Sequence, residues 1–367
     1  MRFLKKFMLT VFLIATVLSV SGFMFMQQGT FGSAPNGKRL ERIQNSPNFR
    51  NGSFQNLTET PMQAEDASMV GMLFSFFNKP KNTSPSTPIP FVTSDLKAAG
   101  TESPSIYWFG HSSYLIKTKA YNVLVDPVFS GYASPVSFMV KAFEGANTYA
   151  ASDMPQIDVL VLTHDHYDHL DYNTISALKD SVAHFVVPLG VGAHLEDWGV
   201  AESKITELDW WETANYKELT FTATPARHFS GRGLARGKSL WTSYVLQMPK
   251  HKIYIGGDSG YEEHFKEIGS KFGSFDLAIL ENGQYNKNWP YIHMMPEQVV
   301  QAAKDLQAEV LFPVHSGKFA LALHAWNEPL QRVVKSASES QLKVTTPMIG
   351  EPIVIGERYP ATQWWTN

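Results

Sequence analysis

The sequence contains no cysteine among its 367 residues, and this absence removes several kinds of chemistry. Disulfide bonds, thiolate zinc sites and cysteine nucleophiles are all excluded. A basic charge excess is also missing, because 31 Lys and Arg stand against 34 Asp and Glu. A nucleic-acid binder that works by charge alone is therefore not expected. Apolar residues make up 44% of the chain and charged residues 18%, so a sizeable core can form.

An uncharged apolar run extends from Phe7 to Met26, and Arg2, Lys5 and Lys6 precede it. A run of this length can cross a bilayer as a helix. It ends in FMFM rather than in a clear small-x-small cleavage site, which favours a retained anchor over a cleaved signal peptide for residues 1–26. Because the basic residues precede the run, the remainder should be exported. We expect the exported remainder to stay at the membrane on the periplasmic or extracytoplasmic side, or to be secreted to the periplasm if the apolar run is cleaved.

Residues 27–103 are expected to form an extended arm with a proline-rich linker. Residues 27–60 are polar and rich in Gly, Asn and Ser, and the segment 79–90 carries four prolines. Between them lies a short apolar patch, MVGMLFSFFN, at 69–78. We expect this patch to pack on the main domain, with contact to a membrane as the alternative.

From residue 104 the sequence alternates between strand and helix patterns. The run IDVLVLT at 157–163 is typical of a strand buried on both faces. Other strands are expected within 105–129, 184–190, 219–231, 239–260, 275–283 and 308–319, and helices within 172–180, 194–200 and 295–307. Strands come first and then alternate with helices. This order predicts an α/β fold in which two sheets are covered by helices, an αββα sandwich, over residues 104–350, followed by a C-terminal tail at 351–367.

The nine residues THDHYDHLD at 163–171 follow directly on the buried strand and hold three of the chain's 12 histidines. Imidazole nitrogens and carboxylate oxygens are ligands that zinc takes. His164 and His166 are one residue apart, which puts both side chains on the same side of an extended segment. The step to Asp168 and His169 can then reach a second metal position. A polar turn that caps a helix explains one of these residues but not four.

Three further ligand-type residues follow predicted strands downstream. His228 stands in TPARHFSG, Asp258 follows two glycines in YIGGDSGY, and His315 stands in LFPVHSG. Any one of them alone is better interpreted as an ordinary core or surface residue. Together, all at strand ends, they favour a centre that holds two metal ions.

The pattern H-x-H-x-D-H, then a lone His, an Asp after Gly-Gly and a last His, resembles the metallo-β-lactamase-fold hydrolases. The segments WFGHSSYLIKTKAYNVLVDPVFS, PARHFSGR and PVHSGKFALALH are similar to the branch that contains N-acylphosphatidylethanolamine-hydrolysing phospholipase D and its bacterial relatives. The resemblance extends over about residues 104 to 345.

The resemblance implies two Zn²⁺ ions per chain. One would be held by His164, His166 and His228, and the other by Asp168, His169 and His315. Asp258 would bridge the two ions and would be catalytic, because it orients the attacking hydroxide.

The resemblance also implies supporting roles near the centre. Asp126 would support a ligand from behind. His293 would be a second catalytic residue, in contact with the substrate or the leaving group, with a place at the start of a helix as the alternative. His111 matches a family position, and a structural role suits it at least as well. His324 either lines the pocket or caps a helix.

Such a centre predicts a zinc-dependent hydrolase in which a metal-bridging hydroxide attacks phosphorus or a carbonyl carbon. The resemblance implies a phosphodiesterase of phospholipase D type that acts on N-acylphosphatidylethanolamine-like lipids. A lactonase or a soluble phosphodiester hydrolase of the same superfamily is the first alternative, and a non-catalytic, membrane-tethered metal-binding protein is the second. The expected partners are a phospholipid or other phosphodiester and the membrane, with no nucleic acid, and a homodimer is left open.

Overall fold

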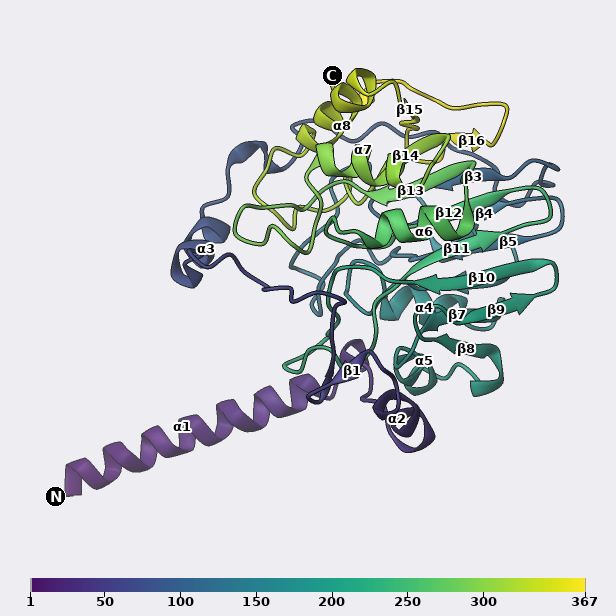
Figure 1. Ribbon diagram of the computed structural model, residues 1–367. Helices are drawn as coiled ribbons and strands as arrows, with labels where there is room; N and C mark the ends of the chain where they lie inside the picture. The colour runs from purple at the N-terminus through teal and green to yellow at the C-terminus, as the bar shows by residue number, and fades with distance from the viewer. Residues whose placement is uncertain (1, 367) are drawn as a thin grey trace.

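The computed structural model describes residues 2–366, and two seven-stranded sheets stacked face to face form its main body (Figure 1). In spatial order the first sheet contains β16 (Pro352–Val354), β3 (Ser105–Trp108), β4 (Tyr114–Lys117), β5 (Asn122–Val125), β6 (Ile157–Val161), β7 (Val182–Pro188) and β8 (Ile205–Leu208). The second contains β15 (Lys343–Val344), β14 (Val310–Val314), β13 (Leu277–Glu281), β12 (Lys252–Ile255), β11 (Ser243–Gln247), β10 (Leu219–Thr224) and β9 (Thr213–Tyr216).

The apolar strands are buried on both faces, and β13 illustrates why. Leu277 and Ile279 belong to the core between the two sheets, whereas Ala278 and Leu280 pack against the outer helices. Successive side chains of a strand point to opposite faces, so a strand covered on both sides needs a continuous apolar run. Fully burying one such aliphatic side chain stabilises the fold by about 1.5–3 kcal/mol.

Helices cover the outer face of each sheet. On the first sheet these are α4 (Tyr172–Leu178) and α5 (Gly192–Asp197), and on the second α6 (His264–Phe272), α7 (Pro296–Asp305) and α8 (Glu328–Glu339). In α7, Val299, Val300 and Ala303 form the buried stripe that packs on the sheet. The layer order is helix, sheet, sheet, helix, so the predicted αββα sandwich is confirmed.

The direction of the strands places many of their carboxyl ends at one edge of each sheet. β5 runs parallel to β6, and β3 is antiparallel to the intervening β4, so β3, β5 and β6 point the same way. In the second sheet β12, β13 and β14 are parallel, and β10 shares their direction across the antiparallel β11. Loops at these ends can therefore converge from both sheets.

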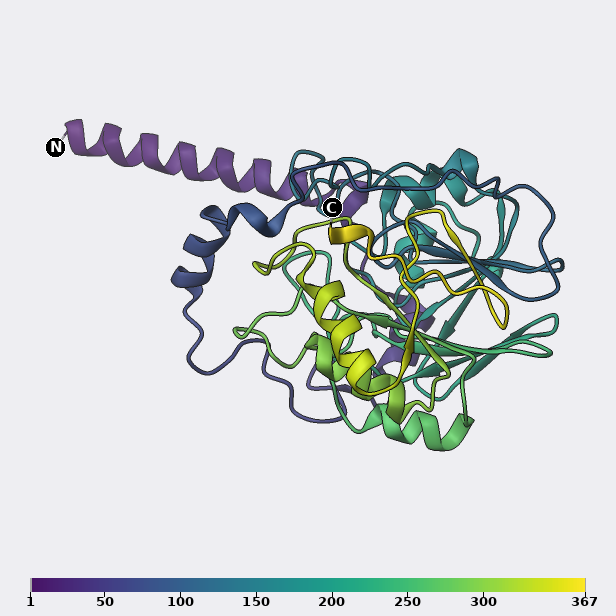
Figure 2. The ribbon, with the colours of Figure 1, turned by 90° about the horizontal axis from the view of Figure 1, so that it is seen from above.

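The N-terminal region lies outside the sandwich. Helix α1 (Arg2–Met26) projects away from the body in both views (Figures 1 and 2) and has no buried residue in its described length. It is long and apolar enough to cross a membrane. The arm continues through α2 (Gly37–Gln44), the hairpin of β1 (Phe49–Arg50) and β2 (Ser53–Phe54), and α3 (Met69–Phe77).

Two parts of the chain differ from the simplest expectation. In the apolar patch at 69–78, Val70 is 79% exposed and Phe74 is 69% exposed, so the expected packing of this patch on the main domain is wrong for these two side chains. At the other end, β16 pairs with β3, and Trp364 and Trp365 are buried in the core between the sheets. Residues beyond 350 therefore contribute to the first sheet and its packing.

Candidate metal centre

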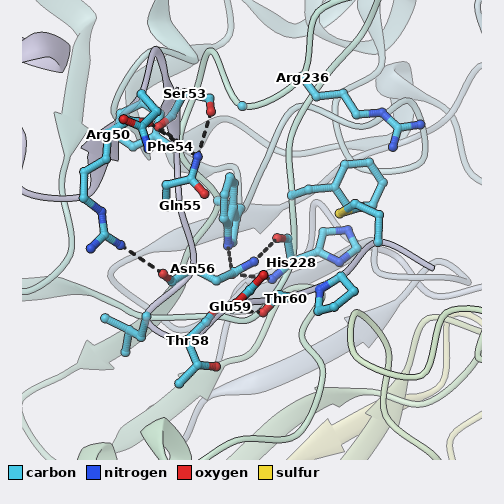
Figure 3. Close-up of a pocket in the computed structure, with 17 residues that line it drawn as sticks. Arg50, Ser53, Phe54, Gln55, Asn56, Thr58, Glu59, Thr60, His228 and Arg236 are labelled. Carbon is cyan, nitrogen blue, oxygen red and sulfur yellow. Dashed lines mark hydrogen bonds between the residues drawn. The ribbon is translucent and has the colours of Figure 1, made fainter. Parts of the chain in front are cut away.

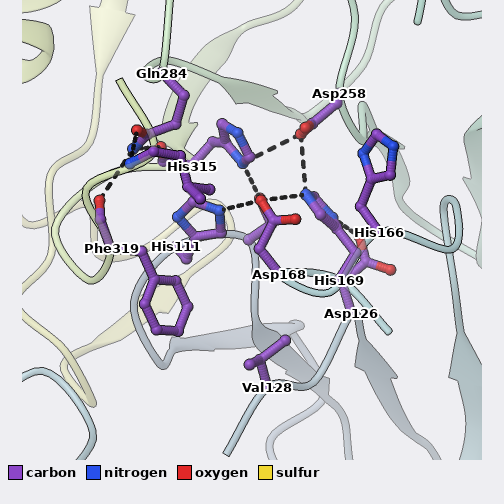
Figure 4. Close-up of polar contacts among 12 residues, drawn as sticks. His111, Asp126, Val128, His166, Asp168, His169, Asp258, Gln284, His315 and Phe319 are labelled. Carbon is purple, nitrogen blue, oxygen red and sulfur yellow. Dashed lines mark hydrogen bonds and ion pairs between the residues drawn. The ribbon is translucent and has the colours of Figure 1, made fainter. Parts of the chain in front are cut away.

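The seven side chains expected as ligands meet at the strand ends of both sheets. Figure 4 shows His166, Asp168, His169, Asp258 and His315 among them. His164, His166 and His228 form one group, with one ligand atom of each lying within 4.8 Å of the others. A second group with the same spacing contains Asp168, His169, His315 and also His111. The structure therefore brings together the residues that the sequence placed at separate strand ends.

Asp258 lies between the two groups, and each of its carboxylate oxygens faces one of them. Oδ1 is 3.2 Å from His169 Nε2 and 3.2 Å from His315 Nδ1. Oδ2 is 3.7 Å from His228 Nε2 and 3.9 Å from His164 Nε2. The two glycines before Asp258 bring the chain in tightly, because a Cβ on Gly257 would lie 2.8 Å from Thr163 Cβ. The carboxylate is thus placed to bridge the two groups.

The donor atoms fit a divalent cation. His169 Nε2 and Asp258 Oδ1 are both buried and lie 3.2 Å apart, yet within residues 2–366 neither atom has a contact with hydrogen-bond geometry. An unpaired buried polar atom costs about 1–3 kcal/mol, so such atoms need an explanation. Imidazole nitrogen and carboxylate oxygen are zinc-type ligands, and a bound cation would satisfy both atoms.

The electrostatics of the cluster keep several imidazoles neutral. Burial lowers the pKa of His164, His228 and His315 well below the usual range. A neutral imidazole has a free lone pair, which a metal ligand requires. His169 behaves differently: burial lowers its pKa, but Asp258 and Asp168 more than offset this and raise it well above the usual range. The negative potential at His169 would favour a cation as it favours a proton.

Asp126 holds His169 from behind, at the end of β5. Its Oδ2 accepts hydrogen bonds from His169 Nδ1 at 2.8 Å and from Thr163 Oγ1 at 2.6 Å, and its Oδ1 accepts one from the Thr163 amide at 2.9 Å. When the ring is neutral, its proton lies on Nδ1 and is shared with the Asp126 carboxylate, so the lone pair is on Nε2, which faces Asp258. Asp126 therefore sets both the tautomer and the direction of the His169 ring.

His111 lies at the centre rather than at a distance from it. Its ring is fully buried, and Nε2 is 2.8 Å from Asp168 Oδ2. Its backbone also joins the two sheets, because the His111 amide donates to Ser316 O and the His315 amide donates to His111 O. His111 thus orients a predicted ligand and also has a structural function.

His293 lies beside the cluster, together with a carboxylate that the sequence analysis missed. Glu281, the last residue of β13, is fully buried, and its Oε2 is 3.5 Å from His293 Nδ1. Its Oε1 accepts a 2.6 Å hydrogen bond from the Met294 amide. Burial raises the pKa of Glu281 to about 7. Burial lowers the pKa of His293, but Glu281 outweighs it and the net shift is upward. The sequence did contain a signal for Glu281, because it is an acidic residue at the end of the apolar strand β13.

The N-terminal arm also reaches the centre, through Asn56 (Figure 3). The side-chain nitrogen of Asn56, Nδ2, donates a hydrogen bond to His228 O at 2.9 Å. The side-chain oxygen, Oδ1, accepts hydrogen bonds from the backbone amide of His228 at 3.0 Å and from Trp241 Nε1 at 3.1 Å. These bonds fix the backbone of His228. A cavity of about 760 Å³ is lined by the arm, including Arg50, and by His228, Phe229 and Arg236 of the main domain. Nothing in the polar sequence of the arm predicted this role.

His324 does not belong to the cluster of ligand atoms. Its Nε2 accepts a 2.8 Å hydrogen bond from the Gln284 amide. The Gln284 side chain in turn accepts bonds from the amides of Leu321 and Ala322. His324 therefore fixes the loop after β13 against the loop after β14, and both loops border the centre.

Comparison with known proteins gives concordant matches. Residues 121–316 match the family model of the β-lactamase superfamily domain. An uncharacterised protein of Mycobacterium tuberculosis is 39% identical over 325 residues, which cover 87% of each chain. The N-acyl-phosphatidylethanolamine-hydrolyzing phospholipase D 1 of Caenorhabditis elegans is 31% identical over 228 residues, or 58% of this chain and 64% of that protein. Among solved structures, the metallo hydrolase Igni18 of Ignicoccus hospitalis has a TM-score of 0.54 at 20% identity and covers 70% of this chain and 100% of its own.

Proposed function

Since this chain belongs to the metallo-β-lactamase superfamily and is a metal-dependent hydrolase of that fold, we propose that it is a phosphodiesterase of phospholipase D type. The proposed substrates are N-acylphosphatidylethanolamine-like lipids, and the proposed cofactor is a pair of Zn²⁺ ions. The similarity to the phospholipase of Caenorhabditis elegans supports the substrate class.

The position of Asp258 carries the proposal. Its two oxygens face two separate groups of ligand atoms within one buried cluster. His164, His166 and His228 would hold one ion, Asp168, His169 and His315 the other, and Asp258 would contact both. When bound, the ions would supply Lewis acids that lower the pKa of water and neutralise charge on the phosphoryl oxygens.

The protein's own groups would then orient and complete the reaction. Water adds to phosphorus, the P–O bond to the N-acylethanolamine breaks, and phosphatidic acid is the second product. Asp258 would orient the attacking water and accept its proton. His169 is kept in one tautomer by Asp126, and Asp168 is kept in place by His111.

His293 would deliver a proton to the departing alkoxide. Its Nδ1 faces Glu281, so a proton held between these two groups leaves Nε2 as the donor to the leaving oxygen. Burial raises the pKa of Glu281 to about 7, and Glu281 raises the pKa of His293 against the effect of burial, so the pair would hold a proton near neutral pH. Glu281 is thus a positioning residue that acts through His293.

Helix α1 would hold the enzyme at the membrane where its lipid substrate lies. We propose that residues 1–26 form a retained anchor, that residues 27–103 form the arm, and that residues 104–350 form the exported hydrolase domain, whose first sheet and core also include β16, Trp364 and Trp365. The contacts of Phe25 with Phe31 and of Phe31 with Tyr167 support a retained helix, because cleavage after Met26 would remove the Phe25 ring from this cluster.

A substrate comparison on purified full-length protein tests the proposal. N-Acylphosphatidylethanolamine in mixed micelles should release N-acylethanolamine and phosphatidic acid, and bis(p-nitrophenyl) phosphate should release p-nitrophenol. Metal analysis should find about two zinc ions per chain, and His166→Ala should lose both metal and activity. Hydrolysis of a lactone panel without cleavage of either phosphodiester would replace the proposal with a lactonase. Metal binding with no hydrolysis of any of these substrates would favour a non-catalytic protein.

A further inference from the structure

The root of α1 is fixed against the turn that carries the predicted ligands. Arg232 is buried and donates to Thr30 O through Nε and Nη2, at 3.1 and 2.7 Å. Through Nη1 it also donates to the carbonyl oxygens of Asp165 and Leu170, at 2.8 and 2.7 Å. The chain leaving α1 is therefore bonded to both ends of the His166–Asp168 turn. If α1 crosses a bilayer, this turn lies close to the bilayer surface.

Two loops near this root carry exposed apolar side chains. Leu234 is 94% exposed, and a Cβ on the preceding Gly233 would lie 3.1 Å from Met26 Cε at the end of α1. The loop that contributes Ser134 and Pro135 to a pocket shared with residues 28–30 continues into Phe138, which is 72% exposed. These side chains lie beside a helix long and apolar enough to cross a membrane, where a lipid surface could cover them.

Helix α3 lies on the same side of the molecule as α1 in both views (Figures 1 and 2). Ser68 caps it by accepting a hydrogen bond from the Gly71 amide. Val70 and Phe74 are one turn apart, so they share a face, and both are largely exposed. The helix therefore presents apolar side chains outward at a real energetic cost in water.

The segment that carries α3 is tied at both ends to the loops that border the centre. Before the helix, the Ala64 amide donates to Asn288 O at 2.8 Å, in the loop that leads to His293. After the helix, Lys79 Nζ donates to Ala320 O at 2.8 Å, in the loop that follows His315. α3 is thus attached on the His293 and His315 side of the centre, whereas α1 is attached on the His166 side.

We propose that the exposed face of α3 inserts into the lipid surface as a second membrane contact. Together with the root of α1 it would hold the metal centre close to the bilayer, so that a lipid substrate has a short path from the membrane to the centre. This inference rests on the proposed anchoring by α1. Two contacts on opposite sides of the centre fix the orientation of the domain, which a single helix with a flexible tether does not.

The charges beside α3 indicate that the contact is apolar rather than electrostatic. Glu65 and Asp66 precede the helix and Lys79 and Lys81 follow it, so the two signs balance. The occupant that fits this face is therefore the acyl and headgroup boundary of an uncharged bilayer. Insertion should take place in phosphatidylcholine alone and should change little with salt.

The absence of native cysteine makes a direct test simple. Full-length Phe74→Cys carries an environment-sensitive fluorophore and is reconstituted in phosphatidylcholine vesicles. Lys250→Cys, at an exposed position in the hairpin between β11 and β12, is the matched control. We expect a blue-shifted emission at position 74 and quenching by lipids with a doxyl group on the acyl chain, with neither effect at position 250. Val70→Cys should give the same result as Phe74→Cys.

Several outcomes would overturn the inference. Equal emission and quenching at positions 74 and 250 would mean that α3 stays in water. Cross-linking of Phe74→Cys into dimers by a short bismaleimide, in lipid-free detergent, would assign the face to a second copy of the chain. Hydrolysis of bis(p-nitrophenyl) phosphate by the same preparation reports on the proposed function separately. If hydrolysis fails while the probe at position 74 is quenched by the lipids, the proposed function is wrong and the membrane contact of α3 still holds.

Discussion

Replacing Asp126 by Asn tests whether a carboxylate behind His169 prepares that ring for a metal. Asn tolerates the left-handed backbone of this position, where φ is +41°, so the chain path should survive. The hydrogen bonds of the Asp126 side chain should not all survive. Asp126 accepts three, from Thr163 N, Thr163 Oγ1 and His169 Nδ1, whereas one end of an Asn side chain can only donate.

Each orientation of the Asn side chain has a cost. If the Asn oxygen keeps the hydrogen bond from the Thr163 amide, the Asn NH₂ group faces His169 Nδ1. The proton of the neutral His169 ring then moves to Nε2, and the lone pair that faces Asp258 is lost. If the Asn side chain is flipped, the NH₂ opposes the Thr163 amide, and a buried donor left unpaired costs about 1–3 kcal/mol. Both routes weaken the metal site. We expect metal affinity to fall about 10- to 100-fold, or about 1.4–2.7 kcal/mol.

The measurement is a competition titration with a chromophoric zinc chelator, combined with thermal unfolding of the metal-free protein. Asp209→Asn is the matched control, because Asp209 is also buried and accepts bonds from Ser46, Asn48 and Trp210 but lies outside the cluster. It should lower stability and leave zinc affinity unchanged. An Asp126→Asn protein that binds two zinc ions as tightly as the parent would refute the argument about the His169 tautomer.

Three further predictions concern groups around the centre. Because burial raises the pKa of Glu281 to about 7, ionisation of Glu281 lowers the stability of the protein as the pH rises through that value. Glu281→Gln should therefore raise the melting temperature more at about pH 8 than at about pH 5, and it should lower kcat. Equal shifts of the melting temperature at both pH values would contradict this. Asn56→Ala removes the side chain that fixes His228, so it should destabilise the protein by about 1–3 kcal/mol in denaturant titrations and weaken one of the two zinc sites; unchanged unfolding would mean that the arm is not part of the centre. Because neighbouring carboxylates raise the pKa of His169, zinc must displace a proton there, and the zinc Kd should tighten as the pH rises from about 6 to about 9 until that pKa is passed; a Kd that does not change with pH would be inconsistent with a proton on His169.

The sequence predicted the parts of the fold whose side chains are buried on both faces. The runs that became β6, β13 and β14 are short, apolar and bounded by polar residues, and a two-sided burial leaves little other choice. The half-exposed edge strand β9, with its sequence TANY, has no such pattern and was missed, as were the short strands β8, β15 and β16. Helix α8 was missed although Leu330, Val333 and Ala337 repeat at helical spacing, so there the signal was available.

The candidate site was predictable to the same degree and for a related reason. A loop that follows a buried strand must emerge at a sheet edge, so ligand-type residues after several strands can be expected to meet. What the sequence cannot supply is the contact between elements that are far apart along the chain. Asn56 meets His228 across 172 positions, and Glu281 meets His293 only because the loop after β13 turns back. Neither contact leaves a periodic pattern.

The backbone contacts at the centre both join the two sheets and position the residues of the metal site. His111, Asp126 and His315 all have positive φ, at +53°, +41° and +63°, in a region that costs non-glycine residues about 1–2 kcal/mol each. Glycine at these positions would remove the strain but also the three side chains. The strain is instead held by bonds from elsewhere: His111 and the His315–Ser316 pair exchange backbone hydrogen bonds, and Asp126 N donates to Val161 O on the next strand. Because His111 belongs to the first sheet and His315 to the second, these bonds also join the rims of the two sheets. The packing that holds the sandwich together is therefore what brings the two halves of the metal centre within reach of Asp258.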